Sequence, residues 1–415
     1  MSNLTDMGQK AKLSAQELAA ALSGKKNNAL FAIADEIEKN TAPVLSANEI
    51  DLTEAAKNGM SIAMQDRLRL TAERLFAIAG AVRYVAALDD PIGKVLSGDI
   101  RPNGLQIIKR TVPLGVIGII YESRPNVTVD SAVLCLKSGN ACILRGSKDA
   151  INSNRELAVI MRRAVHSAGF SPDIIQLVED TSRETATKMM QLNGYIDVLM
   201  PRGGAGLISA VVKNSTLPVI ETGTGNCHIF VDESAKLDMA VDILDNAKTS
   251  RPGVCNAVET LLVHKNIAEA FLPMAAERLA KSSVELRACE QSLAILGDKA
   301  VPATEQDWAT EYEDYILAIK IVDDVNKAIA HIEKFSTKHS EAIITENHSN
   351  ATLFTDMIDS AAVYINASTR FTDGGEFGLG AEIGISTQKL HARGPMGLTH
   401  LTGYKYIING CGQIR

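Results

Sequence analysis

Long apolar runs and basic blocks are both missing from this sequence of 415 residues. No stretch approaches the ~20 consecutive apolar residues that a membrane-spanning helix needs. The first residues, Met1–Asp6, also lack the charged-then-apolar pattern of a secretion signal. We therefore expect a soluble, cytoplasmic protein. Lys and Arg total 42 against 49 Asp and Glu, and the resulting net charge of −7 is spread along the chain. The lack of a basic segment argues against a nucleic-acid-binding surface.

Cysteine and histidine spacings typical of metal or disulfide sites are absent too. The six cysteines never form C-x-x-C, and the eight histidines never form H-x-x-H or H-E-x-x-H. These are the spacings of zinc sites and redox motifs, and disulfide frameworks belong to short secreted chains. We therefore expect no metal ion and no disulfide. Aromatic residues make up only 4% of the chain, and its many Ala, Val and Ile residues suit helices packed on a buried sheet.

Helical and strand-like patterns divide the first half of the chain. Up to about Leu96 the pattern is helical, with Ser14–Glu17 in the form of a capping box and a helical face from Gln65 to Ala87. An extended segment over 105–112 follows. Short apolar strands then alternate with helices, the strands at 116–121, 141–145, 174–178, 196–200 and 218–220, the helices at 127–137, 150–167, 181–192 and 203–213. This alternation predicts a parallel sheet covered on both faces, with ligands at the carboxyl ends of its strands.

A cysteine in a turn-forming segment is the strongest chemical feature. Cys255 lies within Thr249–Asn256, which also contains Pro252 and Gly253. Thirty-four residues earlier (255 − 221 = 34), Glu221 opens a glycine-rich turn. A bend that exposes sulfur and backbone N–H groups suits a thiol that forms an acyl intermediate and stabilises an oxyanion. A buried structural cysteine is the alternative. Cys255 is therefore the candidate nucleophile, and Glu221 is a candidate general base or a structural carboxylate.

A glycine pair before one of the predicted helices is a candidate phosphate site. Gly204-Ala205-Gly206 opens this helix, but Ser209 stands where a G-x-G-x-x-G fingerprint needs its last glycine. The standard dinucleotide fingerprint is therefore absent. Backbone N–H groups at Gly203 and Gly204 can still hold a phosphate at a helix N-terminus, and a turn without a ligand is the alternative.

A second candidate for nucleotide binding follows the strand at 141–145. Arg145, Ser147 and Lys148 lie on the edge of the sheet where ligands bind. Two cations and a hydroxyl at that edge can hold a ribose 2′-phosphate, which favours NADP over NAD. A solvated loop is the alternative.

Several longer motifs resemble the aldehyde dehydrogenase superfamily. The resemblance rests on Glu221-Thr222-Gly223, Cys255, the strand end at 143–147 and the glycine-rich region at 377–380. Within the superfamily the chain is similar to the γ-glutamyl phosphate reductase family over nearly its whole length. The motifs are Glu-Ser-Arg-Pro-Asn (122–126), Met-Pro-Arg-Gly-Gly (200–204), Arg-Pro-Gly-Val-Cys-Asn (251–256) and Arg-Phe-Thr-Asp-Gly-Gly-Glu-Phe-Gly-Leu-Gly (370–380).

This resemblance implies an aldehyde dehydrogenase-like α/β fold with three parts. A Rossmann-like NADP-binding domain is expected over 1–228 and an α/β catalytic domain over 229–358. Residues 359–415 are expected to return to the cofactor domain and to supply an oligomerisation tail. The hairpin region 101–114 and this tail are expected to form a small β oligomerisation flap, which implies a homo-oligomer.

The resemblance also implies a reaction: NADPH reduces L-glutamate 5-phosphate to L-glutamate 5-semialdehyde and phosphate leaves, the second step of proline biosynthesis. Cys255 attacks the acyl phosphate, and the resulting thioester accepts hydride. Asn256 and nearby N–H groups are expected to hold the oxyanion, Glu311 to contact the cofactor ribose, and Arg251 and Arg370 to bind the anionic substrate. Functional coupling to glutamate 5-kinase is a further expectation.

Three other readings remain open at this point. The first is a hydrolytic, NAD-dependent aldehyde dehydrogenase, which phosphate-dependent chemistry would separate from a reductase. The second is a thiol acyltransferase or amidase, which predicts no nicotinamide binding and needs a histidine such as His228 or His391 beside Cys255. The third is a non-catalytic oligomeric scaffold, against which the Cys255 loop argues.

Overall fold

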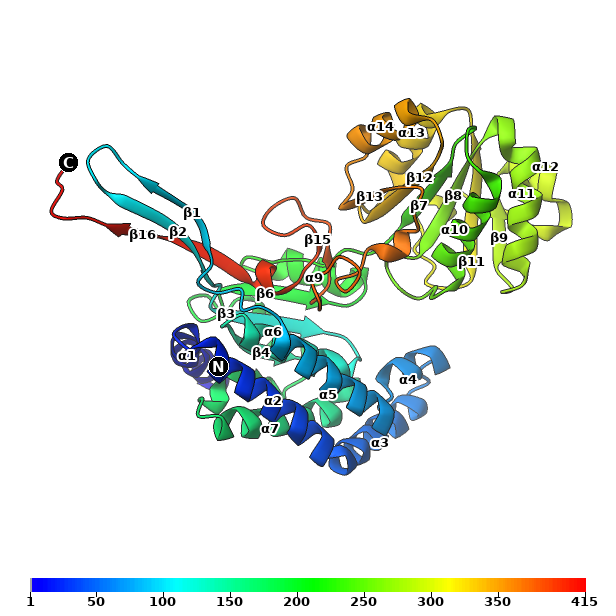
Figure 1. Ribbon diagram of the computed structural model, residues 1–415. Coiled ribbons are helices and arrows are strands. Elements are labelled where there is room, and N and C mark those ends of the chain that lie inside the picture. Colours follow the sequence, from blue (N-terminus) through cyan, green and yellow to red (C-terminus); the bar gives the residue numbers. More distant parts are fainter. Residues whose placement is uncertain (1) are drawn as a thin grey trace. The chain divides into compact units, whose positions relative to one another are not determined.

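The computed structural model describes residues 2–415 and divides the chain into two compact units (Figure 1). Unit 1 contains the chain up to Glu221 together with Leu379–Gly384 and Met396–Arg415, and unit 2 contains Thr222–Gly378 and Ile385–Pro395. The first boundary lies at Glu221, close to the predicted position 228. The chain next leaves unit 2 after Gly378, whereas 358 was expected as the end of the catalytic domain. The functional assignment of the ranges stays a prediction.

Helices α1 to α5 form the N-terminal part of unit 1. The predicted capping box at Ser14–Glu17 is wrong, because α1 runs through it without interruption. Leu4, Ala11, Ala15 and Leu18 are all buried at helical spacing, so one apolar stripe continues along α1. The bounds are α1 Ser2–Ala19, α2 Ser23–Lys39, α3 Thr41–Lys57, α4 Ile62–Leu68 and α5 Ala72–Ala87.

The predicted helix over 65–87 is two helices, because a cap and a tertiary contact break it. Thr71 caps α5, with its hydroxyl accepting the N–H of Arg74 at 3.2 Å. The buried side chain of Asn48 donates to the Leu68 carbonyl at 2.9 Å and accepts the Leu70 N–H at 2.8 Å. Asn48 therefore satisfies the backbone groups that the break leaves unpaired.

A four-stranded parallel sheet forms the centre of unit 1, with the strand order β5-β4-β3-β6. The predicted alternation is confirmed, with β3 Val116–Tyr121, α6 Pro125–Lys137, β4 Ala141–Arg145, α7 Ile151–Ser167, β5 Ile175–Leu177, α8 Arg183–Met190, β6 Val198–Arg202 and α9 Ala205–Asn214. The predicted strand at 218–220 is wrong, because only Val219 forms a single bridge, to Leu199. β3 and β4 are almost wholly buried, which explains their continuous apolar sequence.

A three-stranded antiparallel sheet with the order β1-β2-β16 also belongs to unit 1 (Figure 1). Its strands are β1 Val95–Ile100, β2 Gln106–Pro113 and β16 Thr402–Asn409. The helical pattern was expected to continue to Leu96, but α5 ends at Ala87 and Pro91 follows in the connection. Residues 101–105 are therefore the turn of a hairpin that begins earlier than predicted.

Unit 2 is built on a seven-stranded parallel sheet with the order β10-β9-β11-β8-β7-β12-β13. The strands are β7 Cys227–Val231, β8 Val258–His264, β9 Glu285–Ala288, β10 Val301–Pro302, β11 Ile316–Val322, β12 Ser340–Ile344 and β13 Ala362–Ile365. Successive side chains of β7 face opposite sides, since Ile229 and Phe230 belong to different apolar cores. The predicted α/β class is confirmed by this sheet and by that of unit 1.

Helices cover both faces of this sheet (Figure 1). One core contains Leu244, Phe271 and Leu296, and the other contains Ile329 and Phe354. The helices on the first face are α10 Leu237–Thr249, α11 Lys265–Ala280 and α12 Glu290–Leu296, and those on the second are α13 Val325–Phe335 and α14 His348–Met357. A short antiparallel pair, β14 Ile385–Ser386 and β15 Gly394–Pro395, completes unit 2.

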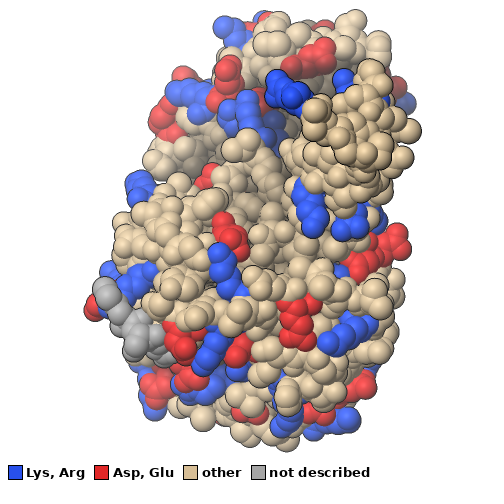
Figure 2. All heavy atoms as spheres, turned by 90° about the vertical axis from the view of Figure 1, so that its left-hand side faces the viewer, with Lys and Arg blue, Asp and Glu red and all other residues tan. Residues whose placement is uncertain are grey.

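The surface carries charges of both signs. Figure 2 shows Lys and Arg side chains interspersed with Asp and Glu on the face that it presents. Among the described residues, no helix is long and apolar enough to cross a membrane.

Candidate active site

Cys255 lies in the loop between α10 and β8, at the amino end of the unit 2 sheet. The residue is half-buried. The glycine turn before β7 packs directly on it, because a Cβ atom at Gly225 would lie 1.5 Å from the Cys255 carbonyl oxygen. The thiol of Cys227 donates to the same carbonyl oxygen at 3.2 Å. The two sequence motifs around Glu221 and Cys255 therefore converge through Gly225, a contact that only glycine permits.

Asn256 was expected to hold the oxyanion, and in this structure its side chain has other partners. Its side-chain amide donates to the carbonyls of Thr372 at 2.9 Å and Arg370 at 3.3 Å, so both amide hydrogens are used. Its side-chain oxygen accepts from the guanidinium of Arg370, and its backbone carbonyl accepts the Thr369 hydroxyl at 2.7 Å. Asn256 therefore fastens the cysteine loop to the turn at 369–372.

The two arginines predicted to bind substrate differ in their surroundings. Arg251 is exposed at the start of the cysteine loop. Arg370 is half-buried and donates from Nε to the Ser250 hydroxyl at 3.0 Å. Burial lowers the pKa of Arg370 and the charge of Arg251 lowers it further, while Asp373 and Cys255 oppose this. The structure thus brings both cations to the loop that carries the thiol, and Arg370 also braces that loop.

Glu311, expected at the cofactor ribose, contacts the glycine turn in this structure. Its carboxylate accepts the N–H of Gly225 at 2.7 Å. Burial raises the pKa of Glu311, the Gly225 hydrogen bond opposes that shift, and the charge of Glu313 adds to it. Glu311 therefore helps to hold the backbone that packs on Cys255, and a contact with ribose stays a prediction.

The buried histidines of unit 2 are occupied by other partners. His228 lies on β7 with no exposed surface, and its ring pairs with the Glu341 carboxylate at 3.0 Å. His339 is also buried, and burial lowers its pKa to about 4. The ring of His339 lies 3.8 Å from the Cys227 sulfur and 2.8 Å from the Ser340 hydroxyl. His228 is thus held in the core rather than presented as a base for the thiol.

The predicted cation pair in unit 1 is divided between two environments. Arg145 turns toward the loop after β5, where its guanidinium donates to the carbonyls of Thr181 at 2.5 Å and Ser182 at 3.2 Å. Burial lowers the pKa of Arg145, and Asp180 opposes that shift. Lys148 by contrast is exposed. Of the two cations, only Lys148 is presented to solvent for a ribose phosphate.

Ser147 is used to begin a short helix. Its hydroxyl accepts the N–H of Asp149 at 3.0 Å and lies 3.0 Å from the Ser123 hydroxyl and 2.9 Å from the Asp149 carboxylate. A carboxylate beside the predicted 2′-phosphate position disfavours a second anion there. The Ser147 hydroxyl therefore has other partners in this structure, and the contacts of Ser147 and Lys148 with a cofactor phosphate stay predictions.

The predicted phosphate site at Gly203 and Gly204 already holds an anion. The Glu122 carboxylate accepts the Gly204 N–H at 3.1 Å, at the N-terminus of α9. A Cβ atom at Gly203 would lie 2.5 Å from the carboxyl carbon of Glu122, so glycine is what admits this side chain. A helix N-terminus favours negative charge, and the carboxylate confirms that this one can receive an anion. A cofactor phosphate at the same N–H would have to displace Glu122.

Glu221 is half-buried and is the last residue of unit 1 before the boundary. Cys255 lies in unit 2, so the predicted relation between this carboxylate and the thiol stays a prediction. Five of the predicted cofactor residues, Arg145, Ser147, Lys148, Gly203 and Gly204, belong to unit 1, and Glu311 belongs to unit 2.

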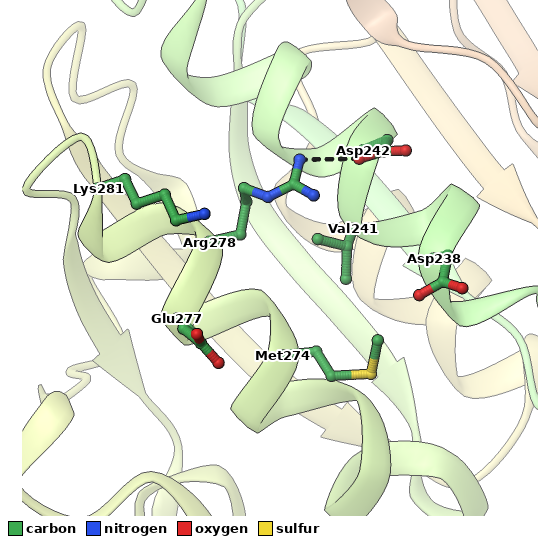
Figure 3. A pocket seen from close by; sticks show the side chains of 7 residues that line it. All are labelled: Asp238, Val241, Asp242, Met274, Glu277, Arg278 and Lys281. Atoms are coloured by element: carbon green, nitrogen blue, oxygen red, sulfur yellow. Dashed lines mark hydrogen bonds and ion pairs between the residues drawn. The ribbon is translucent and has the colours of Figure 1, made fainter.

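A pocket of about 460 Å³ lies between α10 and α11, and none of the predicted site residues lines it (Figure 3). Arg278 pairs with Asp242 across it at 2.8 Å. The lining thus combines acidic side chains of α10 and α11 with the basic side chains of Arg278 and Lys281. In the described part of the chain, no group of three or more His, Cys, Asp or Glu side chains is arranged to hold a metal ion.

Comparison with known proteins shows the family to which the whole chain belongs. The profile of the aldehyde dehydrogenase family matches residues 3–292. A γ-glutamyl phosphate reductase of Clostridium perfringens is 58% identical over 408 residues, which is 98% of each chain. The solved γ-glutamyl phosphate reductase of Thermotoga maritima is 50% identical, covers 99% of each chain and has a TM-score of 0.96. The chain belongs to the γ-glutamyl phosphate reductase family.

More distant structures of the superfamily share the fold alone. The acetylating aldehyde dehydrogenase of Geobacillus thermoglucosidasius is 16% identical with a TM-score of 0.73 over 100% of this chain. The predicted resemblance and the aldehyde dehydrogenase-like fold are both confirmed. The γ-glutamyl phosphate reductase of Thermotoga maritima and this chain thus share the aldehyde dehydrogenase fold.

Sequence reasoning missed several residues that build this site. Gly225 stands in a recognised motif, but nothing local indicates that its backbone touches Cys255. Glu122 also lies in a recognised motif, 82 residues from the glycine that it caps. Thr369 and Thr372 form hydrogen bonds with Asn256 and lie more than a hundred positions away from it. Contacts of this kind leave no periodic signal in a sequence.

Proposed function

We propose that this chain reduces L-glutamate 5-phosphate with NADPH to L-glutamate 5-semialdehyde and phosphate, as the family name implies. This is the second step of proline biosynthesis. The observation that carries the proposal is the half-buried Cys255 in a loop braced by Gly225, Asn256 and Arg370, in a chain similar to these reductases over nearly its full length. The same support favours a reductase over a scaffold, and the occupied His228 disfavours a thiol–histidine amidase.

The chemistry begins at the thiol of Cys255. As thiolate it attacks the acyl carbon, a carbon–sulfur bond forms, and the carbon–oxygen bond to phosphate breaks as phosphate leaves with the electron pair. Backbone N–H groups of the cysteine loop are the candidates to hold the developing oxyanion, since the Asn256 amide is committed elsewhere. Arg251 and Arg370 supply positive charge for an anionic substrate.

The residues of unit 1 fit a nicotinamide dinucleotide in chemistry. The α9 N-terminus attracts an anion, since the Glu122 carboxylate lies there and a cofactor phosphate would take its place, and Lys148 presents an exposed cation after β4. We assign the cofactor phosphates to Gly203 and Gly204 and the 2′-phosphate to Lys148. When bound, NADPH supplies the hydride that reduces the thioester on Cys255. The preference for NADP over NAD rests on Lys148.

Oligomerisation is part of the proposal. All of β1 is exposed, and Val95, Leu96 and Ile100 on it are at least 54% exposed. On β16, Tyr404, Tyr406 and Ile408 are similarly exposed. Apolar side chains on a long edge of a sheet invite pairing with another chain, and we assign this sheet to a homo-oligomer interface. We also propose a cytoplasmic location and functional coupling to glutamate 5-kinase, because the proposed reaction is a step of proline biosynthesis.

The reverse reaction tests the proposed function. The purified protein is given glutamate 5-semialdehyde and NADP⁺, and reduced cofactor is followed by absorbance with and without inorganic phosphate. We expect reduction that requires phosphate and is lost in Cys255→Ala. Equal reduction without phosphate would mean that water resolves the thioester and would assign a hydrolytic dehydrogenase instead. Activity retained in Cys255→Ala would remove the nucleophile assignment.

A further inference from the structure

A buried ion pair joins the two ends of the loop that carries Cys255. Lys248 lies in the last turn of α10, directly before the loop, and Glu259 is the second residue of β8, directly after it. The Lys248 Nζ and Glu259 Oε2 atoms are 2.5 Å apart, and the two side chains are 0% and 1% exposed. The catalytic loop is therefore closed at its base by a pair of opposite charges.

Stability alone is a weak reason for such a pair. Two charges removed from water cost more than their attraction returns unless the geometry is good, and apolar pairs of similar volume are often as stable. A lysine in the last turn of a helix ordinarily extends its ammonium group to solvent. Here burial lowers the pKa of Lys248 and raises that of Glu259 to about 7, and each partner opposes the shift of the other.

The pair is coupled to the sulfur atoms of the site. Cys227, whose thiol donates to the Cys255 carbonyl, interacts electrostatically with Cys255, Glu259 and Lys248. Other charged or titratable groups also face the pair or the thiol. The Glu313 N–H donates to Glu259 at 3.3 Å, and Glu311, Tyr312 and Asp314 also interact with the pair. Arg370 interacts with Cys255, and Arg251 interacts with Arg370.

We propose that Lys248 and Glu259 are positioning residues for Cys255: their ion pair holds the loop closed and keeps the charge at the base of this loop balanced. This inference rests on the proposed function, in which Cys255 is the nucleophile. Both side chains are fully buried, so neither is exposed to substrate or cofactor and both act through the loop. Glu259→Gln removes a carboxylate that disfavours a thiolate nearby and leaves Lys248 as an ammonium or its neutral amine. Lys248→Met leaves a carboxylate or its neutral acid, and removes a cation that favours the thiolate.

The two single variants are therefore expected to shift the pKa of the Cys255 thiol in opposite directions. The measurement is the rate of alkylation of Cys255 by iodoacetamide against pH, with the modified peptide identified by mass spectrometry. We expect the midpoint to fall by about one pH unit in Glu259→Gln and to rise by a similar amount in Lys248→Met. A double variant, Lys248→Met with Glu259→Leu, should return toward the wild-type midpoint because the charges are removed together.

Lys265→Met is the matched control. Lys265 is a lysine of unit 2 paired with Asp323 at 3.0 Å, but it begins α11 at the carboxyl end of β8, and both partners are more than half exposed. It should leave the midpoint unchanged. A purely structural pair would slow alkylation in both single variants with no shift or with shifts of the same sign, and either result would overturn the proposal.

Failure of this inference can be told apart from failure of the proposed function. If Cys255 is alkylated no faster than Cys289 or Cys411, and Cys255→Ala stays active, the nucleophile assignment itself falls. If Cys255 is the reactive thiol but its pH profile is the same in all variants, only the role of the ion pair falls. Should Lys248→Met not fold, the isosteric Glu259→Gln decides alone, since an unchanged or raised midpoint contradicts the proposal.

Discussion

Adjacent residues in the cysteine loop have different roles. Cys255 is presented to the surface of the loop, whereas the side chain of Asn256 is consumed by the backbone and guanidinium of the turn at 369–372. Arg145 and Lys148 differ in the same way, because one guanidinium is turned inward to backbone carbonyls and one ammonium is exposed. Residue type therefore predicts what a side chain is able to do, and its partners decide what it does.

Lys148 is predicted to select the cofactor. Lys148→Ala should weaken the binding of NADPH about tenfold, because a cation that contacts a phosphate contributes roughly 1–2 kcal/mol of binding free energy. The binding of NADH should be nearly unchanged. Arg145→Ala should affect both cofactors equally, since its guanidinium braces the loop after β5. Dissociation constants from titration of cofactor fluorescence test this, with Lys213→Ala on α9 as a control. Equal loss of NADPH and NADH in Lys148→Ala would remove the 2′-phosphate assignment.

At the scale of the element, the glycine turn before β7 packs against the cysteine loop. Residues 222–226 lie against the cysteine loop because Gly225 has no side chain, and Glu311 and Thr337 accept the N–H groups of Gly225 and Asn226 at 2.7 and 2.9 Å. Two loops from different parts of the sequence thus pack together at the candidate nucleophile. A side chain at this contact would separate them.

Gly225→Ala should therefore reduce the turnover rate more than a hundredfold. Its Cβ atom would lie 1.5 Å from the Cys255 carbonyl oxygen, which is backbone and has little room to move. The matched control is Gly80→Ala in the interior of α5, where nothing lies within 4 Å of the added atom. That change should leave activity intact and raise stability by about 1 kcal/mol, because alanine is the better helix former. Steady-state rates and urea unfolding test both, and an active Gly225→Ala would contradict the packing described here.

At the scale of the whole molecule, each unit has its own vulnerability. Unit 2 buries His331 among Trp308 and Phe335, and Lys320 lies 3.3 Å from its ring nitrogen. Burial lowers the pKa of His331 to about 2, and His228 and Lys320 add to the shift. Unit 1 instead exposes apolar residues on the β1-β2-β16 sheet. Acid and the proposed subunit contacts are therefore expected to act on different parts of the chain.

Unit 2 should lose stability in mild acid. Below pH ~6.5 the unfolded chain protonates His331 while the folded one does not, so stability is full above that pH and falls as pH decreases. At pH 5 the loss should be about 2 kcal/mol from this histidine. The chain has one tryptophan, Trp308, beside His331, so urea unfolding followed by its fluorescence reports on unit 2. His331→Leu should show a smaller change between pH 7.5 and pH 5, and an equal change would show that other groups dominate.

The exposed sheet of unit 1 should control the oligomeric state. Tyr406→Asp combined with Ile408→Lys places charges on β16, where the native side chains are 58% and 59% exposed. We expect the molar mass from light scattering to fall, with little change in the fold of either unit. Ile62→Lys is the control, since that side chain is 87% exposed on α4 and outside this sheet. An unchanged mass in the double variant would place the interface elsewhere.

Much of the architecture was accessible from the sequence because it depends on local periodicity. Continuous apolar patterns predict the strands at 116–121 and 141–145 and the helix between them. Pro252 and Gly253 indicate the turn in the Cys255 segment. The failures were also local in origin. The box at Ser14–Glu17 has the right residues for a helix start, but buried Ala11 and Leu18 on either side keep α1 continuous.

Tertiary structure alone decided which partners the site residues take. Asn256 meets Arg370 across 114 positions, and Glu122 reaches Gly204 across 82. Lys248 is chemically an ordinary last-turn lysine, and only the strand beside it makes it a buried partner of Glu259. By itself the sequence determined the fold class, the family and the candidate thiol. The packing decided which polar groups remain available for chemistry, because a hydrogen bond or ion pair depends on distance in space and not on separation along the chain.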